Sequence, residues 1–186
     1  MSDWTAETAE WYADKYGEYP TNRITIEQLD LPSDATVVDI GCGTASALRH
    51  AATKVTTGTL IGIDPVPRMI EIARERLADH PAAERIQLHL APAHALPLGD
   101  GIATVVLALD SYDHWVPQQR EGLAEARRIL APDGRLVVVK DAIVPHTAQA
   151  KDVFPAALDA GGFQIVDVRE TKTAEVSFTT WICVGS

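Results

Sequence analysis

The chain has 186 residues, of which 46% are hydrophobic and 23% are charged, and these values are typical of one soluble globular domain. Its 26 acidic residues outnumber its 16 basic residues and give a formal net charge of −10 at pH 7. This charge, without a local basic cluster, argues against nucleic acid or an anionic membrane as a partner.

The first 32 residues are predicted to form a helical cap ahead of the core. Helical spacing of aromatic residues predicts an amphipathic helix over residues 4–18, and a second short helix is expected over 23–30, after Pro20. The aromatic residues at these spacings are Trp4, Trp11, Tyr12 and Tyr16. Two interpretations stay open for Trp11, Tyr12 and Tyr16: their rings close over a substrate as a lid, or they pack into the core.

Residues 33–186 are predicted to form the core, because near-continuous apolar strands alternate there with helices. Strands are expected at 36–41, 59–64, 86–91, 103–109 and 135–141, and helices at 44–53, 67–79 and 117–130. This alternation is typical of a parallel sheet that helices cover on both faces. The sequence PDG at 132–134 predicts a turn just before the fifth strand.

The C-terminal segment departs from this alternation. A short helix, with Pro155 in its first turn, is expected to end before the glycine pair at 161–162. Two strands follow at 163–170 and 175–184, and only TKTA separates them, which predicts an antiparallel hairpin. The predicted fold is therefore one α/β domain with a doubly wound, mostly parallel, seven-stranded sheet and a C-terminal hairpin.

The stretch VVDIGCGTA, residues 37–45, ends the first predicted strand with an acid and two glycines. In a doubly wound sheet, ligands bind beyond the carboxyl ends of the strands, and the free N–H groups of the next helix favour an accepting ligand group. Asp64 ends the second predicted strand, and its two oxygens suit the two hydroxyls of a ribose. Gly41, Gly43 and Asp64 thus predict a nucleotide-like ligand. The alternative is a tight turn with a helix-capping Asp64.

The glycine pattern differs from a dinucleotide fingerprint, which requires G-x-G-x-x-G/A, because Ser46 stands at the third position and the pattern is D-x-G-x-G. From about residue 33 to 186 the chain resembles the class I S-adenosylmethionine-dependent methyltransferases. The resemblance rests on VVDIGCGTA (37–45), GIDPVPRMIEIARERL (62–77), AHALPLGDG (93–101), LAEARRILAPDGRLVVV (123–139) and the closing hairpin. It implies a Rossmann-like methyltransferase fold, S-adenosyl-L-methionine as cofactor and S-adenosyl-L-homocysteine as product.

The resemblance also implies roles for residues at the strand ends. Gly41 and Gly43 would approach the methionine part of the cofactor, and Asp39 would help to bind its amino group. Asp64 would hold the ribose. The other residues expected at the cofactor are Cys42, Pro65 or Val66 beside the adenine, Ala93, His94 and Asp110.

Two positions depart from the family pattern. Ala45 stands where a third glycine is common, and Pro92 stands where the family has an acid near the adenine amine. His94 or the backbone at Ala93 would then contact the adenine instead. Losing one side-chain hydrogen bond costs about 0.5–1.5 kcal/mol, so the assignment of the cofactor stands.

The stretch LALDSYDHWVP, residues 107–117, carries the chemistry expected beside the reacting methyl group. Catalysis of methyl transfer consists mainly of positioning the nucleophile, and a base such as His114 serves where the nucleophile must lose a proton. Asp110 or Asp113 would bind a substrate amine or orient a histidine, and Tyr112 and Trp115 would form an aromatic wall.

Structural alternatives stay open for the same stretch. His114 and Trp115 would otherwise form a packed loop-to-helix junction, and Asp110 and Asp113 would serve as caps or turn residues. A metal site built from Asp110, Asp113 and His114 is also conceivable, but we predict none. We place Trp11, Tyr16 and Trp115 at the substrate. Three further residues follow the fifth strand and either line the pocket or interact with neighbours: Lys140, Asp141 and His146.

Two cysteines, Cys42 and Cys183, lie far apart without metal-ligand spacing, which is typical of a reducing compartment. The polar start MSDWTAETAE lacks the apolar segment of a secretory signal, and no apolar run has the length of a membrane span. We therefore expect a cytoplasmic protein, either a monomer or a homodimer.

The leading functional prediction is a methyltransferase that acts on a small-molecule acceptor by in-line transfer. No long insertion follows the fifth predicted strand, so a separate substrate domain is not expected. Two alternatives stay open. One is a nicotinamide- or flavin-dependent oxidoreductase, but Ser46 and the predicted hairpin argue against it. The other is a non-catalytic module that binds S-adenosylmethionine.

Overall fold

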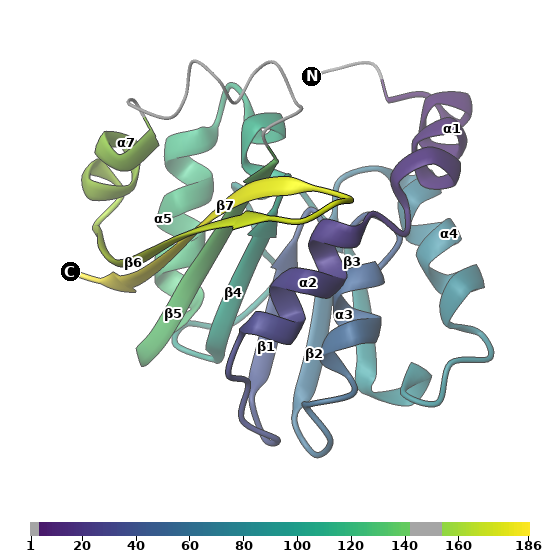
Figure 1. The fold of residues 1–186 in the computed structure, drawn as a ribbon, viewed down its shortest axis with the longest axis horizontal. Helices are drawn as coiled ribbons and strands as arrows, with labels where there is room; N and C mark the ends of the chain where they lie inside the picture. Colours follow the sequence, from purple (N-terminus) through teal and green to yellow (C-terminus); the bar gives the residue numbers. More distant parts are fainter. Residues whose placement is uncertain (1–3, 142–153) are drawn as a thin grey trace.

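A seven-stranded sheet forms the centre of the computed structural model, which describes residues 4–141 and 154–186 (Figure 1). Its strands are β1 (Thr36–Ile40), β2 (Thr59–Asp64), β3 (Ile86–Leu90), β4 (Ala103–Leu109), β5 (Leu130–Asp141), β6 (Phe163–Lys172) and β7 (Ser177–Gly185). The spatial order is β3-β2-β1-β4-β5-β7-β6. Strands β1 to β5 are parallel, and β7 is antiparallel to β5 and β6. The predicted α/β sheet with a C-terminal antiparallel hairpin is confirmed.

Helices cover both faces of this sheet. The helices are α1 (Ala6–Tyr16), α2 (Pro20–Gln28), α3 (Ser46–Ala51), α4 (Pro67–Leu77), α5 (Gln119–Ile129) and α7 (Phe154–Ala160), with short 3-10 turns η1 (Ala83–Arg85) and η2 (Tyr112–Trp115). Buried residues of α2, α3 and α4 pack with one face of the strands, whereas α5 and α7 pack with the other. Neighbouring residues such as Val37 and Val38 belong to opposite faces, as the alternation of a strand requires.

Two of the differences from the predicted boundaries have a clear physical reason. Helix α2 begins at Pro20 rather than near Arg23, because proline has the backbone angle of a first helical turn and needs no hydrogen-bond donor there. The predicted turn at 132–134 lies inside β5, where residues 131–134 bulge opposite the single residue Thr104 of β4. The chain therefore keeps its strand pairing on both sides of PDG.

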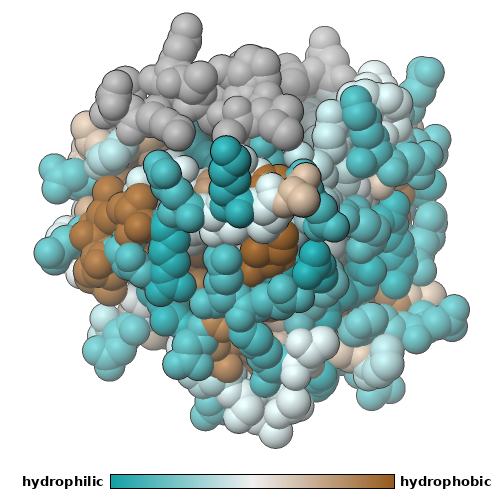
Figure 2. Space-filling model, viewed as in Figure 1, coloured by the Kyte–Doolittle hydropathy of each residue, from teal (hydrophilic) through white to brown (hydrophobic). Residues whose placement is uncertain are grey.

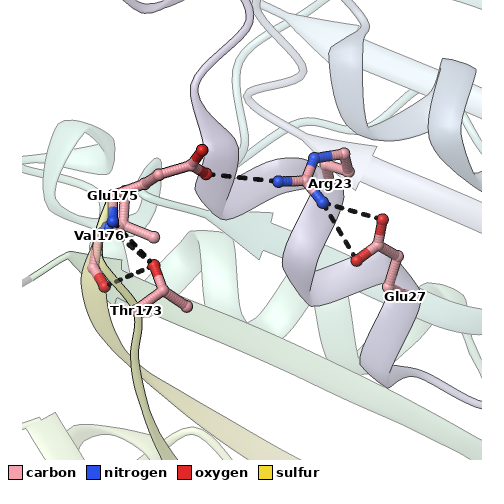
Figure 3. Close-up of polar contacts among 5 residues, drawn as sticks. All are labelled: Arg23, Glu27, Thr173, Glu175 and Val176. Carbon is pink, nitrogen blue, oxygen red and sulfur yellow. Dashed lines mark hydrogen bonds and ion pairs between the residues drawn. The ribbon is translucent and has the colours of Figure 1, made fainter.

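Helix α2 is held against the turn of the β6–β7 hairpin (Figure 3). Arg23 lies 3.0 Å from Glu27 within α2 and 3.4 Å from Glu175 at the turn. The turn itself is closed by Thr173 Oγ1, which accepts hydrogen bonds of 3.1 Å from the backbone N–H groups of Glu175 and Val176. The N-terminal segment and the C-terminal hairpin are thus joined on one side of the sheet.

The molecular surface is mostly hydrophilic on the face shown in Figure 2, where hydrophobic residues form a few separate patches. The edge strand β6 carries two exposed apolar side chains, Val166 and Val168. Among the helices of residues 4–141 and 154–186, none combines the length and apolar character needed to cross a bilayer.

The order of the strands reverses at β1, which has β2 on one side and β4 on the other. Consecutive crossovers therefore leave the sheet in opposite directions, and a crevice opens beyond the carboxyl ends of these strands. The segments that leave the three strands there are 41–45, 65–66 and 110–115. The fold brings the glycine turn, Asp64 and the LALDSYDHWVP stretch to one place.

Candidate active site

The turn after β1 is fixed by neighbouring strands. The backbone N–H groups of Gly41 and Cys42 donate to the carbonyl of Ile63 at 2.7 and 3.0 Å. Gly41 has a φ of +82°, and a Cβ atom there would lie 2.4 Å from the Cβ of Ser111. Ser111 in turn donates to the carbonyl of Ile40 at 2.5 Å. Gly41 is therefore required by packing between the ends of β1 and β4.

Gly43 has a different reason to be glycine. Its φ is +50°, and nothing lies within 4 Å of the position that a Cβ atom would take. Its N–H donates to Asp64 Oδ2 at 3.0 Å, while Asp64 Oδ1 accepts from the N–H of Val66 at 2.9 Å. The open space at Gly43 lets a ligand approach the backbone, and Asp64 stands beside it.

Two cavities meet at these strand ends. The first, of about 200 Å³, lies between the glycine turn, the end of β2 and the segment after β3. The second, of about 340 Å³, lies between the glycine turn, α1 and the end of β5. The residues that line both cavities are Tyr12, Gly41, Gly43, Leu109, Asp110 and His114. The two cavities therefore form one site with a junction at these residues.

The structure brings every predicted cofactor residue to this site. Those that line the first cavity are Gly41, Gly43, Asp64, Pro65, Val66, Ala93, His94 and Asp110. Asp39 and Cys42 line the second cavity, together with Gly41, Gly43 and Asp110. Pro92, at the position of the missing acid, also lines the first cavity.

The predicted catalytic residues separate into two groups. Asp110, Asp113 and His114 line the second cavity, and His114 packs its ring edge-on against Trp4 at a centroid distance of 6.1 Å. Tyr112 is 6% exposed and lines neither cavity, because its ring packs against Trp115 and Phe154. Tyr112 was expected in an aromatic wall of the site, but its ring instead packs η2 against the core.

The predicted substrate residues also separate. Trp11 and Tyr16 line the second cavity, whereas Trp115 lies at the first cavity, packed against Tyr112. Asp141 lines the second cavity. Lys140 points to the opposite face of β5, where its Nζ lies 2.7 Å from Asp113 Oδ1. His146 lies outside the described residues.

The sequence did not single out several lining residues as part of the site, namely Trp4, Tyr19, Asn22, Met69 and Ser111. Tyr19 carried a usable signal, because Tyr12, Tyr16 and Tyr19 continue a helical spacing and their rings form a chain of contacts at 5.1 and 5.8 Å. Ser111 and Met69 lie within the stretches 107–117 and 62–77 but were not predicted as site residues, and Trp4 and Asn22 reach the site through tertiary contacts.

Burial makes three carboxylates of the site, those of Asp39, Asp64 and Asp110, costly to ionise. Burial raises the pKa of Asp39 to about 7, and the charge of Asp64 adds to the shift. Burial raises the pKa of Asp64 to about 6 against the opposing effect of its two backbone N–H donors. Burial raises the pKa of Asp110 to about 7, opposed by a hydrogen bond from the N–H of Asp141. A cationic ligand group would stabilise the ionised forms of these side chains.

The residues present fit S-adenosylmethionine. Asp39 is 3% exposed and lines the second cavity, and its Oδ1 has no hydrogen-bond partner among the described residues, which suits a ligand ammonium group. Gly43 leaves room beside the backbone, and Asp64 offers two oxygens at the first cavity. Across residues 4–141 and 154–186, no group of three or more potential ligands is placed to hold a metal ion.

Known proteins match this chain in sequence and in fold. The family model described as methyltransferase domain matches residues 37–134. The ubiquinone/menaquinone biosynthesis C-methyltransferase UbiE of Citrifermentans bemidjiense is 31% identical over 122 residues, which are 63% of this chain and 50% of that protein. The 27-O-demethylrifamycin SV methyltransferase of Amycolatopsis mediterranei is 30% identical over 164 residues, which are 86% of this chain and 56% of that protein. The chain thus spans about half the length of these relatives.

A crystal structure of a SAM-dependent methyltransferase from Aquifex aeolicus superposes with a TM-score of 0.79 at 14% identity and covers 98% of this chain and 100% of that one. At this identity the likeness concerns the fold alone. The family match extends from β1 through the glycine turn and Asp64 to the PDG bulge in β5. The chain belongs to the methyltransferase-domain family, and its fold is that of the class I S-adenosylmethionine-dependent methyltransferases.

Proposed function

We propose that this chain transfers the methyl group of S-adenosylmethionine to a small-molecule acceptor by in-line displacement. The observation that carries the proposal is the joint placement of Asp39, Gly43 and Asp64 around one site at the switch point of the sheet. Membership of the methyltransferase-domain family supports it.

Each of these residues has a distinct task in the proposal. Asp39 binds the ammonium group of the cofactor, and Asp64 accepts hydrogen bonds from the ribose hydroxyls while it holds the N–H of Gly43. Pro65 and Ala93 lie at the first cavity, where the adenine would bind. The bound cofactor supplies an electrophilic methyl group on a sulfonium centre.

The size of the second cavity supports a small acceptor. A volume of about 340 Å³ is within the range of small-molecule pockets, roughly 300–1,000 Å³. Two relatives of this chain are named for small molecules, an arsenite methyltransferase and the rifamycin SV methyltransferase. Acceptor and cofactor would meet at the junction between the cavities, beside Asp110 and His114.

Residues 1–32 serve in this proposal as a cap on the core formed by 33–186, within one domain. Helix α1 packs through Ala9 and Ala13 on Met69 of α4. Its C-terminal end is joined to the glycine turn, because Thr44 Oγ1 donates to the carbonyl of Gly17 at 2.7 Å. The cap thus forms the outer wall of the acceptor cavity.

Ligand-induced stabilisation tests the proposal. S-adenosylhomocysteine at 100 times its dissociation constant should add about 2.7 kcal/mol to the free energy of unfolding, whereas NADH should add nothing. The reverse result would support the oxidoreductase alternative. Release of S-adenosylhomocysteine that depends on an added acceptor would then separate an enzyme from a non-catalytic module, and a tightly bound cofactor without such release would support the module.

A further inference from the structure

The outer wall of the acceptor cavity is a set of aromatic rings. Three come from α1, and the fourth precedes α2: Trp11, Tyr12, Tyr16 and Tyr19. The Trp11 and Tyr16 rings lie 6.0 Å apart, and both already contact a cation, because Lys15 Nζ lies 5.0 Å from the first centroid and 5.1 Å from the second. These two rings therefore already attract one ammonium group, that of Lys15, which is not itself a lining residue of the cavity.

The inner wall of the same cavity is acidic. Its carboxylates are Asp39, Asp110, Asp113 and Asp141, and among the described lining residues there is no lysine or arginine. In the proposed function Asp39 binds the ammonium group of the cofactor. Asp113 forms an ion pair with Lys140, whose side chain lies on the opposite face of β5. Asp110 and Asp141 then stand on the acceptor side.

Asp110 and Asp141 are held next to one another by the backbone. The N–H of Asp141 donates to Asp110 Oδ1 at 2.6 Å, and the Tyr19 hydroxyl forms a hydrogen bond with the Asp141 side chain. Asp110 also adopts a left-handed backbone conformation with a φ of +53°. Such a conformation is uncommon for residues other than glycine and is concentrated at functional sites.

We propose that the acceptor is a small organic amine, which this cavity binds as an ammonium ion between Asp110 and the tyrosine rings and which is methylated on nitrogen. The inference rests on the proposed function. An ammonium group in the cavity would favour the ionised form of Asp110 and pair with it, whereas a neutral alcohol or phenol would bring no charge to pair with this half-buried carboxyl group. An anionic acceptor would be repelled by the same wall.

The reaction balances without a further reagent. After the ammonium group loses a proton, the nitrogen lone pair forms the new N–CH₃ bond as the C–S bond breaks, and the C–S electron pair stays on sulfur as a neutral thioether. The methylated nitrogen is then an ammonium ion, and a proton that it loses passes to solvent. His114, an exposed side chain at the junction, is placed to carry these protons.

A matched pair of probes tests the recognition step. Choline and its neutral carbon analogue 3,3-dimethylbutan-1-ol have the same shape, and only choline is charged. Their affinities would be measured by calorimetry on the full chain saturated with S-adenosylhomocysteine. We expect choline to bind at least tenfold more tightly. Equal binding of the two, tighter binding of the alcohol, or no binding of either would overturn the inference.

Substitutions test whether the preference for choline arises from residues of the second cavity. Asp110→Asn should lower the affinity for choline about tenfold and leave that for the alcohol unchanged, since asparagine tolerates the left-handed backbone and its oxygen can still accept from Asp141. Tyr16→Leu should lower choline affinity about threefold. Asp133→Asn, which removes the same charge from the exposed PDG bulge, should change neither. An equal effect of Asp110→Asn and Asp133→Asn would overturn the role of Asp110.

The same samples distinguish this inference from the proposed function. Failure of S-adenosylhomocysteine to bind would remove the proposed function itself. Binding of that ligand without preference for choline would remove only the amine inference. Incubation with a mixed pool of small amines, alcohols and phenols would identify the methylated atom by mass spectrometry, and a product methylated on oxygen or carbon would contradict the assignment to nitrogen.

Discussion

The two cavities of the site share six lining residues but are built in different ways. The first is lined in part by one short stretch, because the turn at Gly41 and Gly43 and the carboxylate of Asp64 lie within 24 residues of sequence. Its other lining residues include Asp110 and the segment after β3. The second depends on side chains that come from α1, the α1–α2 link, η2 and the end of β5. In the proposed function, cofactor contacts that come largely from one short stretch are thus joined to an acceptor site whose side chains come from several elements.

This difference predicts where mutations will be tolerated. A change at the glycine turn alters hydrogen bonds between β1 and β2 and so affects the fold together with cofactor binding. A change at Trp11 or Tyr16, which line the second cavity alone, alters only one wall of the acceptor cavity. Single substitutions should therefore separate stability, cofactor affinity and acceptor choice.

The largest effect is expected from Asp64→Ala. The backbone N–H groups of Gly43 and Val66 would lose their acceptor, at about 1–3 kcal/mol each. The ribose would also lose its partner, so we expect S-adenosylhomocysteine to bind at least 100-fold more weakly in calorimetry. Asp64→Asn is the matched control, because it retains one oxygen, and should give an intermediate loss. Unchanged affinity in Asp64→Ala would refute the ribose role.

The two glycines of the turn should respond differently to the same substitution. Gly41→Ala should lower the free energy of unfolding by about 3 kcal/mol, because backbone strain adds to the clash with Ser111. Gly43→Ala should cost only the strain, about 1–2 kcal/mol, and should chiefly weaken cofactor binding. Urea denaturation and calorimetry would measure both. Equal destabilisation by the two variants would remove the distinction between packing and ligand approach.

The sequence predicted the fold and the gathering of the glycine turn and Asp64 at the switch point, because both depend on short-range patterns. Alternating apolar strands and helices indicated the sheet, and D-x-G-x-G followed by Asp64 marked the switch point. The structure adds a reason that the sequence did not contain: Gly41 is needed for packing against Ser111, and only Gly43 faces open space.

The sequence could not predict which side chains of the LALDSYDHWVP stretch face the second cavity, for a physical reason. LALDSYDHWVP contains four chemically rich side chains in a row, but the 3-10 turn η2 sends Tyr112 into the core and Asp113 and His114 toward the cavity. Which of them faces inward depends on Phe154 and Lys140, which lie far away in sequence. Local patterns cannot encode such contacts.

The pH dependence of cofactor binding should sharpen the role of Asp39. With a pKa near 7, its ionised fraction falls about tenfold between pH 8 and pH 6, and affinity for S-adenosylhomocysteine should fall by the same factor. Asp39→Asn should bind weakly and lose most of this pH dependence. A wild-type affinity that stays constant over this range would exclude ionised Asp39 as the partner of the ligand ammonium group.

The raised pKa of Asp39 also predicts how the stability of the ligand-free protein depends on pH. The folded state binds the proton of Asp39 more tightly than the unfolded state does, so this contribution to stability is fully present below about pH 4 and is lost as the pH rises to about 7. Relative to Asp39→Asn, the wild type should therefore become less stable over this interval. Urea denaturation of both proteins at several pH values would measure the difference.

The smallest effect is expected from His114→Ala, and it bears on the acceptor atom. His114 lines both cavities, but Asp39 and Asp64 remain to hold the cofactor, so affinity for S-adenosylhomocysteine should stay within about twofold. If the acceptor is an amine, proton removal is separate from bond formation, and turnover should fall only about fivefold to tenfold. If the acceptor is a hydroxyl group, the base acts in the transition state, where such catalysis contributes about 10²–10⁴-fold. Steady-state turnover of the variant would therefore distinguish nitrogen from oxygen as the methylated atom, and unaltered turnover would remove His114 from the mechanism.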